Sequence, residues 1–465
     1  MPAEPHITIV GGGFSGAAVA IHLLGLMPEG LRVTLLEPRT VPGAGVAYST
    51  AEPSHRINVP ASRMQLAGEE EGAFDRWYRS QPAFADDPQA RREDGSLYPQ
   101  RGQFGRYVSQ RFAEAVRTSG GRLVHLREQA LDFDEIAITT DTGRRLQSDL
   151  LILAVSHPPP ALPRLAVPFH DHPALIANPW RADTLTPIAA DARVAVMGTG
   201  LTMADCIATL SRLGHRGPIT AFSRRGLLSR GNTGSAAAPW PGEYDQGSLR
   251  QRLRLVRADV LRAAEQGLPW QVVLDAVRQQ GQRIWQTLTF ADRQRFLRHL
   301  RRYWDVHRYR IAPQVAEVIE QRQREGSLKV LAARLTALES EARSLTLTLT
   351  LREGERIALT VDRLILTTGP AHGGLIDSQP LLRELARRGL IRADKLGLGL
   401  DVDAHSRAIG REGRAIPNLL ISGPAARGYF GELMGLPQVA DHAAAVAAEA
   451  LQALGIGQSA RCPTI

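Results

Sequence analysis

The sequence predicts an α/β protein with two parallel-sheet domains, the second inserted into the first. Two short apolar runs each lead into a glycine-rich turn and a helix-like segment: IVGGGFSG at 9–16 and VAVMGTGLTMAD at 194–205. Each unit continues into a β-branched strand and later into a hairpin-like meander that ends in Asp and an apolar strand. This order of parts, present twice, indicates a duplicated strand–helix–strand architecture.

The first glycine-rich turn predicts a dinucleotide site of the Rossmann type. It has the spacing G-x-G-x-x-G from residue 11, and glycines there let the backbone and the helix N-terminus approach a pyrophosphate. The next strand ends in Glu37, 26 residues after Gly11, where a carboxylate can bind an adenosine ribose. We therefore predict that FAD binds at Gly11, Gly13, Phe14, Ser15, Gly16 and Glu37.

The second turn predicts a nicotinamide nucleotide. Its third glycine position holds Met203, a departure that affects helix–strand packing, and its next strand ends in Arg224, 26 residues after Gly198. An acid in this place would repel a 2′-phosphate, whereas an arginine can bind one with two donors. The interpretation is NADPH, with NADH as the alternative if Arg224 is a solvated charge. The predicted contacts are Gly198, Thr199, Gly200, Leu201, Thr202 and Arg224.

The two units set the expected domain boundaries. Residues 1–185 are the first part of the FAD domain, and 191–335 form the NAD(P)H domain. Within the second domain, residues from about 246 to 325 have helical apolar spacing and few strand signals, which indicates a helical insertion.

The remaining segment, 336–465, completes both domains. Its strands finish the NAD(P)H domain by about residue 370, and the chain then returns to the FAD domain. The return includes a buried strand that ends at Gly423, predicted to border the flavin. An Ala-rich helix over about 436–453 follows, with its N-terminal end toward the flavin.

Composition excludes several classes of protein. The chain has 465 residues, 43% hydrophobic and 22% charged, as in water-soluble proteins of two or more domains. It has no bilayer-length apolar run and no signal peptide, so we expect a cytoplasmic protein without a membrane partner. Its two cysteines, Cys206 and Cys462, form no CxxC pair, which disfavours a disulfide-reducing flavoenzyme, and no His/Cys cluster predicts a metal.

The positive charge has two interpretations. The net charge is +9, and among 56 basic residues only Lys329 and Lys395 are lysines. A nucleic-acid partner is one explanation. However, the arginines are spread along the chain, and only RRYWDVHRYR at 301–310 resembles a basic and aromatic stripe. We attribute the charge to coding bias and anionic cofactors, and predict no nucleic-acid partner.

These motifs together resemble one flavoprotein family. It includes the FAD-dependent urate hydroxylase and the aspartate N-monooxygenase, and is more distantly similar to the ornithine and lysine N-hydroxylases. The resemblance covers nearly the whole chain. Its carriers are GGGFSG at 11–16, GAGVAYS at 43–49, INVPASRM at 57–64, GTGLTMAD at 198–205, ITAFSRRGLL at 219–228 and LGLGLDVD at 396–403.

The resemblance implies a monooxygenase. In such enzymes FAD is reduced by NADPH or NADH and reacts with O₂, and the peroxyflavin hydroxylates a small polar substrate. Urate is the first candidate, and L-aspartate or another amino acid is the alternative. The pair Met64 and Gln65 resembles the Met-Gln pair beside the flavin in N-hydroxylases.

No catalytic side chain can be assigned from spacing, because the sequence shows no Ser/His/Asp set and no carboxylate pair. Arg63 and Arg101 are candidate contacts for an anionic substrate; the alternative is that they pair with cofactor phosphates or face solvent. Two other functions stay open: an NAD(P)H-dependent flavin reductase and a non-enzymatic flavin redox sensor.

Overall fold

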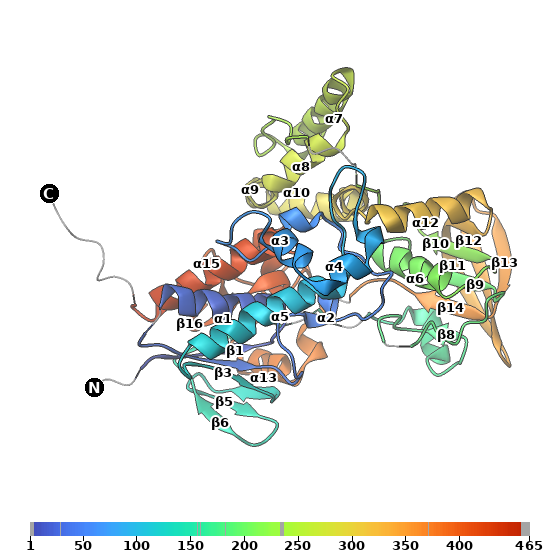
Figure 1. The fold of residues 1–465 in the computed structure, drawn as a ribbon. Coiled ribbons are helices and arrows are strands. Elements are labelled where there is room, and N and C mark those ends of the chain that lie inside the picture. Colours follow the sequence, from blue (N-terminus) through green and yellow to red (C-terminus); the bar gives the residue numbers. More distant parts are fainter. Residues whose placement is uncertain are drawn as a thin grey trace.

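The chain folds around two parallel sheets, which lie side by side in Figure 1. The structure is a computed structural model, and it describes residues 4–27, 29–155, 157–158, 160–181, 183–232, 237–370 and 372–456. Cys462 lies outside these ranges. Two Rossmann-like sheets with helices confirm the predicted α/β fold.

The first sheet has six strands, and all of them except its edge strand β15 run parallel. Their order is β15 (Arg407–Ile409), β16 (Ala415–Ile421), β7 (Leu150–Leu153), β1 (His6–Val10), β2 (Arg32–Leu36) and β3 (Leu123–Leu126). The central strands are mostly apolar because both faces are covered: helices lie on one face, and a small separate sheet with one helix lies on the other. Strand β16 comes from the C-terminal part of the chain and pairs with β7.

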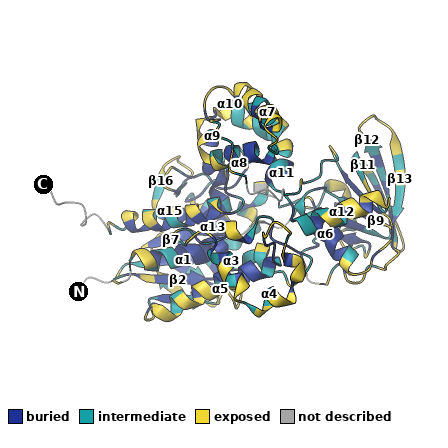
Figure 2. Cartoon of the chain, turned by 45° about the horizontal axis from the view of Figure 1, so that its top comes forward, coloured by how far each residue is buried: buried dark blue, intermediate teal, exposed yellow. Residues whose placement is uncertain are grey.

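Two small-residue helices cover one face of this sheet. Helix α1 (Phe14–Leu26) packs against the C-terminal helix α15 (Gln438–Ala453). Ala17, Ala18, Ala443 and Ala447 are fully buried between them and the sheet. Small side chains at these positions let the helices approach closely. Figure 2 shows both helices buried on their inner sides.

The second sheet has seven strands. Their order is β13 (Arg356–Val361), β12 (Ser344–Leu351), β11 (Leu328–Glu341), β10 (Ile219–Ser223), β9 (Val194–Met197), β14 (Arg363–Leu366) and β8 (Leu175–Ile176). Strands β8 to β11 and β14 are parallel, and β11, β12 and β13 form an antiparallel meander. The first meander, in contrast, is a separate small sheet of β4 (Ala130–Phe133), β5 (Ala137–Thr140) and β6 (Arg145–Gln147).

Two elements lie on a different side of the expected boundaries. Strand β8 lies within the range 1–185, yet it pairs with β14 of the second sheet. Helix α12 (Pro313–Arg324) lies within the expected helical insertion, yet it packs on α6 (Leu201–Arg212) and links β10 to β11. We propose that the first domain part ends before Leu175 and that the insertion ends before Pro313.

The insertion itself stands above the two sheets in Figure 1. A π-helical turn at Phe296–Leu300 joins its last two helices. No helix in the described part of the chain is both long and apolar enough to cross a bilayer. The helices of the insertion are α7 (Leu249–Glu265), α8 (Gln271–Gln279), α9 (Gly281–Thr287), α10 (Phe290–Arg295) and α11 (Arg301–Arg308).

The remaining helices surround the first sheet. They are α2 (Gly45–Tyr48), α3 (Ala73–Arg79), α4 (Pro82–Asp86), α5 (Arg101–Thr118), α13 (Pro380–Arg388) and α14 (Arg427–Phe430).

A buried ion pair joins the two sheet units. Arg101, at the start of α5, donates from Nη1 and Nη2 to the two carboxylate oxygens of Asp205 on α6, at 3.0 and 3.2 Å. The same guanidinium donates to the carbonyl of Arg56. Close by, His55 and Thr209 share a hydrogen bond of 3.1 Å. Arg101 is therefore held by an internal carboxylate, which differs from its expected roles toward substrate, phosphate or solvent.

This pair predicts a stability effect. Asp205→Ala leaves the Arg101 guanidinium buried without its carboxylate, so we expect the free energy of unfolding to fall by about 3–5 kcal/mol. The exchange of both partners for apolar residues, Arg101→Met with Asp205→Leu, should recover most of the loss. Urea unfolding followed by circular dichroism measures this, with exposed Asp191→Ala as the control. A double variant no more stable than Asp205→Ala would contradict the explanation.

Candidate functional site

The first glycine-rich turn is closed by two contacts that only glycine permits. Gly11 has φ +101°, and a Cβ there would lie 2.4 Å from the carbonyl oxygen of Ala154 at the end of β7. A Cβ on Gly16 would lie 1.9 Å from the carbonyl oxygen of Gly11. The turn is thus packed between the strand end and the first turn of α1, which fixes the position of the helix N-terminus.

The start of α1 is open to a ligand. Gly13 is its N-cap residue, in extended backbone, and within the described residues no side chain caps the helix and no acid lies in its first turn. A Cβ on Gly13 would meet only Gly45, at 3.5 Å. The first N–H groups of the helix have no internal partner and suit an anionic group such as a pyrophosphate.

Glu37 is held in its ionised form beside this turn. Its Oε2 accepts from the Gly12 N–H at 2.8 Å and from Arg39 Nη2 at 2.8 Å, and its Oε1 accepts from Arg39 Nε at 2.9 Å. Burial alone would raise the pKa of Glu37, but the hydrogen bonds from Arg39 outweigh it and lower that pKa. Arg39 was not predicted, although its place two residues after the strand-end acid is a usable signal.

The turn forms one wall of a cavity of about 440 Å³. The opposite wall includes Met434, Gly435 and Leu436, just before α15. Five predicted cofactor residues line the cavity: Gly11, Gly13, Phe14, Ser15 and Glu37. Gly16 lies behind them, where it packs on Gly11.

Gly423, at the end of β16, packs on Ser15 behind the cavity wall, and the next residue, Pro424, lines the cavity. The φ of Gly423 is +79°, and a Cβ there would lie 2.4 Å from Ser15 Oγ. Its N–H donates to His442 Nδ1 at 3.1 Å, so His442 carries its proton on Nε2 and shares it with Ser406 Oγ at 3.1 Å. His442 was not predicted, because its partners come from distant parts of the chain.

Met64, Gln65 and Arg63 also lie outside this cavity's wall. Met64 is buried in the core that includes residues of α1 and α5, and Gln65 accepts a weak hydrogen bond of 3.4 Å from the Gly72 N–H. Arg63 is half-exposed and lies 3.8 Å from Asp275 on α8. Their contacts with flavin and substrate stay predictions.

The second turn repeats the first with two differences, one at Thr199 and the other at Met203. Gly198 has φ +119°, and a Cβ there would lie 2.4 Å from Thr367 Oγ1 at the end of β14. Gly200 is the N-cap residue of α6, and a Cβ there would meet nothing within 4 Å. Thr199 donates to the Leu227 carbonyl at 2.6 Å and thereby ties the turn to the loop after β10.

The other difference is Met203, which is buried at the position of Gly16. A side chain there excludes the close approach seen in the first unit. Leu201 and Thr202 form the first turn of α6, so the remaining predicted residues of this unit also gather at its N-terminus.

Four arginines gather at the end of β10. Arg224 is exposed, and Arg225 donates to the Tyr303 hydroxyl at 2.9 Å while its guanidinium lies 5.3 Å from the ring centroid. Burial lowers the pKa of Arg302, and the charges of Arg224, Arg225 and Arg301 lower it further. The insertion thus brings Arg301 and Arg302, from the basic and aromatic stripe at 301–310, beside the predicted Arg224, a contact between distant segments that spacing does not indicate.

Comparisons with known proteins agree with this geometry. Residues 8–158 match a family model described as FAD-NAD(P)-binding, which identifies this part of the chain as such a region. No curated protein sequence matches the chain.

Solved structures share the whole fold. The L-lysine 6-monooxygenase of Pseudomonas syringae is 17% identical with a TM-score of 0.63, over 96% of this chain and 99% of that chain. The ornithine hydroxylase of Pseudomonas aeruginosa is 15% identical with a TM-score of 0.61, over 97% and 99%. The FAD-bound cadaverine monooxygenase of Erwinia amylovora is 13% identical with a TM-score of 0.58, over 96% and 94%. At these identities the likeness establishes the fold.

The buried His442 predicts a pH effect on stability. Burial lowers its pKa to about 4 from the ordinary 6.5. Between these values the unfolded chain binds a proton that the folded protein does not, so stability falls as pH drops from about 6.5 toward 4. His442→Gln should remove up to ~1.4 kcal/mol per pH unit of this slope. Urea unfolding at several pH values checks it.

The exposed His299, changed to Gln, is the control and should leave the slope unchanged. Equal slopes for the wild type and His442→Gln would show that His442 titrates alike in both states.

Proposed function

We propose that the protein is an FAD-dependent, NAD(P)H-consuming monooxygenase. The observation that carries this proposal is the pair of glycine cradles at the ends of two neighbouring parallel sheets, an ionised acid beside one and an arginine cluster beside the other. Such a reaction consumes NAD(P)H, a proton and O₂, and yields a hydroxylated substrate, NAD(P)⁺ and water.

The first cradle fits FAD. The open start of α1 would receive the pyrophosphate, and Glu37 would accept hydrogen bonds from the ribose. Glu37 is buried and already accepts from Gly12 and Arg39, so its carboxylate is fixed before any ligand arrives. When bound, the flavin supplies the activation of O₂, and the chain's part is to hold it, orient the substrate and exclude water.

The second cradle fits a nicotinamide nucleotide. The N-terminus of α6 is uncapped by any described side chain, and Gly200 leaves space beside it. Arg224, with Arg225 and Arg302 close by, would bind a 2′-phosphate, which favours NADPH over NADH.

One observation disfavours a disulfide-reducing flavoenzyme, and another favours a monooxygenase. Cys206 is buried in α6, and burial raises its pKa, so it is unsuited to thiol–disulfide exchange. Three solved structures of like fold are named as an ornithine hydroxylase, an L-lysine 6-monooxygenase and a cadaverine monooxygenase. Urate and L-aspartate, the substrates expected from the sequence, are the first compounds to test.

The test is a labelling experiment. Purified protein with FAD, NADPH and each candidate substrate is incubated under ¹⁸O₂, and the products are examined by mass spectrometry. We expect NADPH oxidation that consumes O₂ and places label in a product. If only peroxide forms while artificial electron acceptors are reduced quickly, the protein is a reductase.

A pair of variants checks the flavin assignment. Gly13→Asp places a negative charge where the pyrophosphate would lie but meets no steric block, so the protein should fold yet lose flavin absorbance. Gly25→Asp, on the exposed side of the same helix, should retain it. A yellow Gly13→Asp protein would contradict the FAD site.

A second pair addresses the nicotinamide nucleotide. Arg224→Ala should raise the KM for NADPH about ten- to a hundredfold, the value of one charge-assisted contact, and leave the KM for NADH nearly unchanged. The control is Arg216→Ala, an exposed arginine at the opposite end of β10. Steady-state kinetics with both nucleotides measures it. Equal effects on NADPH and NADH would remove the phosphate role of Arg224.

A further inference from the structure

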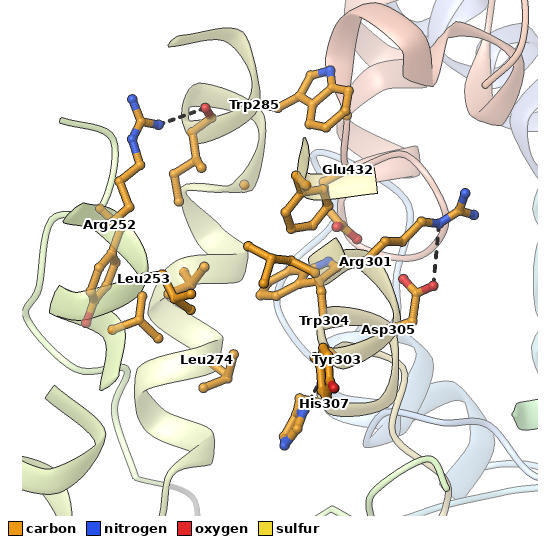
Figure 3. A pocket seen from close by; sticks show the side chains of 18 of the residues that line it. Arg252, Leu253, Leu274, Trp285, Arg301, Tyr303, Trp304, Asp305, His307 and Glu432 are labelled. Atoms are coloured by element: carbon orange, nitrogen blue, oxygen red, sulfur yellow. Dashed lines mark hydrogen bonds and ion pairs between the residues drawn. The ribbon is translucent and has the colours of Figure 1, made fainter. Parts of the chain in front are cut away.

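The helical insertion forms most of the wall of a second cavity, which is larger than the cavity beside the first glycine-rich turn. Its volume is about 770 Å³, within the range of about 300–1,000 Å³ typical of small-molecule sites. The walls come from α7, α8, α9, the π-helical turn and α11, and from the segment 427–434. Most of the lining is apolar; Figure 3 shows Leu253 and Leu274 on one side, and Trp304 and Tyr303 on the other.

This cavity adjoins the dinucleotide cavity. Met434 lines both of them. The insertion is fastened to the same segment of chain: Trp285 Nε1 donates to the Gly428 carbonyl at 3.0 Å, and Arg278 donates to the Leu436 carbonyl. A molecule in the larger cavity would thus lie next to a cofactor in the smaller one.

Both carboxylates on the cavity wall are paired with arginines. Arg301 lies 3.5 Å from Asp305, as drawn in Figure 3. Glu432 lies 2.7 Å from Arg308, which is buried behind it. Arg252 also lies on the wall, and its guanidinium donates to backbone carbonyls of the insertion. Arg252 therefore keeps its positive charge but has oxygen acceptors for its N–H groups.

Arg427 differs from Arg252, the other buried arginine on this wall, because it has no oxygen acceptor among the described residues. It is 5% exposed and lines the cavity, and the described part of the chain has no carboxylate within 4.0 Å of its guanidinium. Its hydrogen bond goes from Nη1 to Met434 Sδ, at 2.8 Å, and a thioether is a weak acceptor. A buried cation without an anion is costly, so the arrangement points to an anion from outside the chain. With the two ion pairs neutral, Arg252, Arg257 and Arg427 leave an excess of positive charge on the wall, which suits an anionic group such as a carboxylate at Arg427.

The π-helical turn at Phe296–Leu300 is a second, independent sign of a binding site. Phe296, Leu297 and Leu300 from this turn all line the cavity. Single π-helical turns are rare inside α-helices and occur frequently at functional sites.

We propose that this cavity binds the substrate of the proposed monooxygenase, and that this substrate has a bulky apolar body and one carboxylate held by Arg427 beside Met434. The inference rests on the proposed function. Urate and small amino acids suit the cavity poorly, because their polar atoms would lie unpaired against apolar walls.

The test measures binding to the purified flavin-containing protein, without NADPH. The probes are dodecanoate, 1-dodecanol and butyrate, titrated by calorimetry: the first has both features, the second lacks the charge and the third lacks the bulk. We expect dodecanoate to bind about ten- to a hundredfold more tightly than 1-dodecanol, as a charge-assisted contact would give. It should also perturb the flavin spectrum. Equal affinity for dodecanoate and 1-dodecanol would overturn the proposal.

Substitutions test which residues bind the carboxylate of the ligand and which bind its apolar body. Arg427→Met should abolish the preference for dodecanoate over 1-dodecanol, and Arg427→Lys should retain part of it. Leu253→Trp should fill the cavity and weaken both ligands alike. The exposed Arg254→Met, on α7, is the control for lost charge. Retention of the preference in Arg427→Met, or unchanged affinities in Leu253→Trp, would refute the site. Loss of flavin in Arg427→Met would assign the arginine to the cofactor.

The outcomes separate this inference from the proposed function. If dodecanoate does not bind while ¹⁸O enters urate or another polar compound, the inference fails and the monooxygenase stands. If dodecanoate binds through Arg427 and no compound gains label, the proposed function fails and the cavity remains a ligand site.

Discussion

The buried contact between Arg101 and Asp205 is the constraint on which the rest of the molecule depends. Each glycine cradle is fixed to the end of its own sheet, so the distance and angle between the cradles are set where α5 meets α6. The guanidinium also binds the Arg56 carbonyl, and His55 bonds to Thr209 alongside. A buried pair of this kind contributes little net stability, but its forked geometry admits one orientation. Electron transfer between two bound cofactors needs such a fixed orientation.

Sequence patterns predicted the features that depend on local chemistry. The turns at Gly11 and Gly198 require left-handed backbone packed on a strand end, and glycine is nearly the only residue that permits it. The strand-end residues Glu37 and Arg224 follow from a fixed spacing within each unit. The alternating and apolar runs predicted both sheets, because the hydrophobic periodicity and the burial of a strand are encoded by the residues of that strand.

Features made by distant segments escaped prediction for a physical reason. Arg427 lines a cavity only once the insertion has folded over it. The hydrogen bonds of His442 form only once Gly423 and Ser406 lie beside it. Strand β8 is only two residues long and pairs with β14. A strand this short has no hydrophobic periodicity from which the pairing could be predicted. Helix α12 has the same spacing as the insertion helices, and its packing on α6 alone assigns it to the second sheet.

The insertion leaves and re-enters the second unit at one place. Gly231 and Ile311 form a bridge, and the Ile311 N–H donates to the Arg230 carbonyl at 3.0 Å, so the ends of the excursion are pinned together. A segment closed in this way can be exchanged: a different helical cap grafted between the same two points would leave both glycine turns in place, but it would remove Arg301 and Arg302 from the arginine cluster. The fold therefore separates the two glycine turns, which are built into the sheets, from a helical module that is closed at its base.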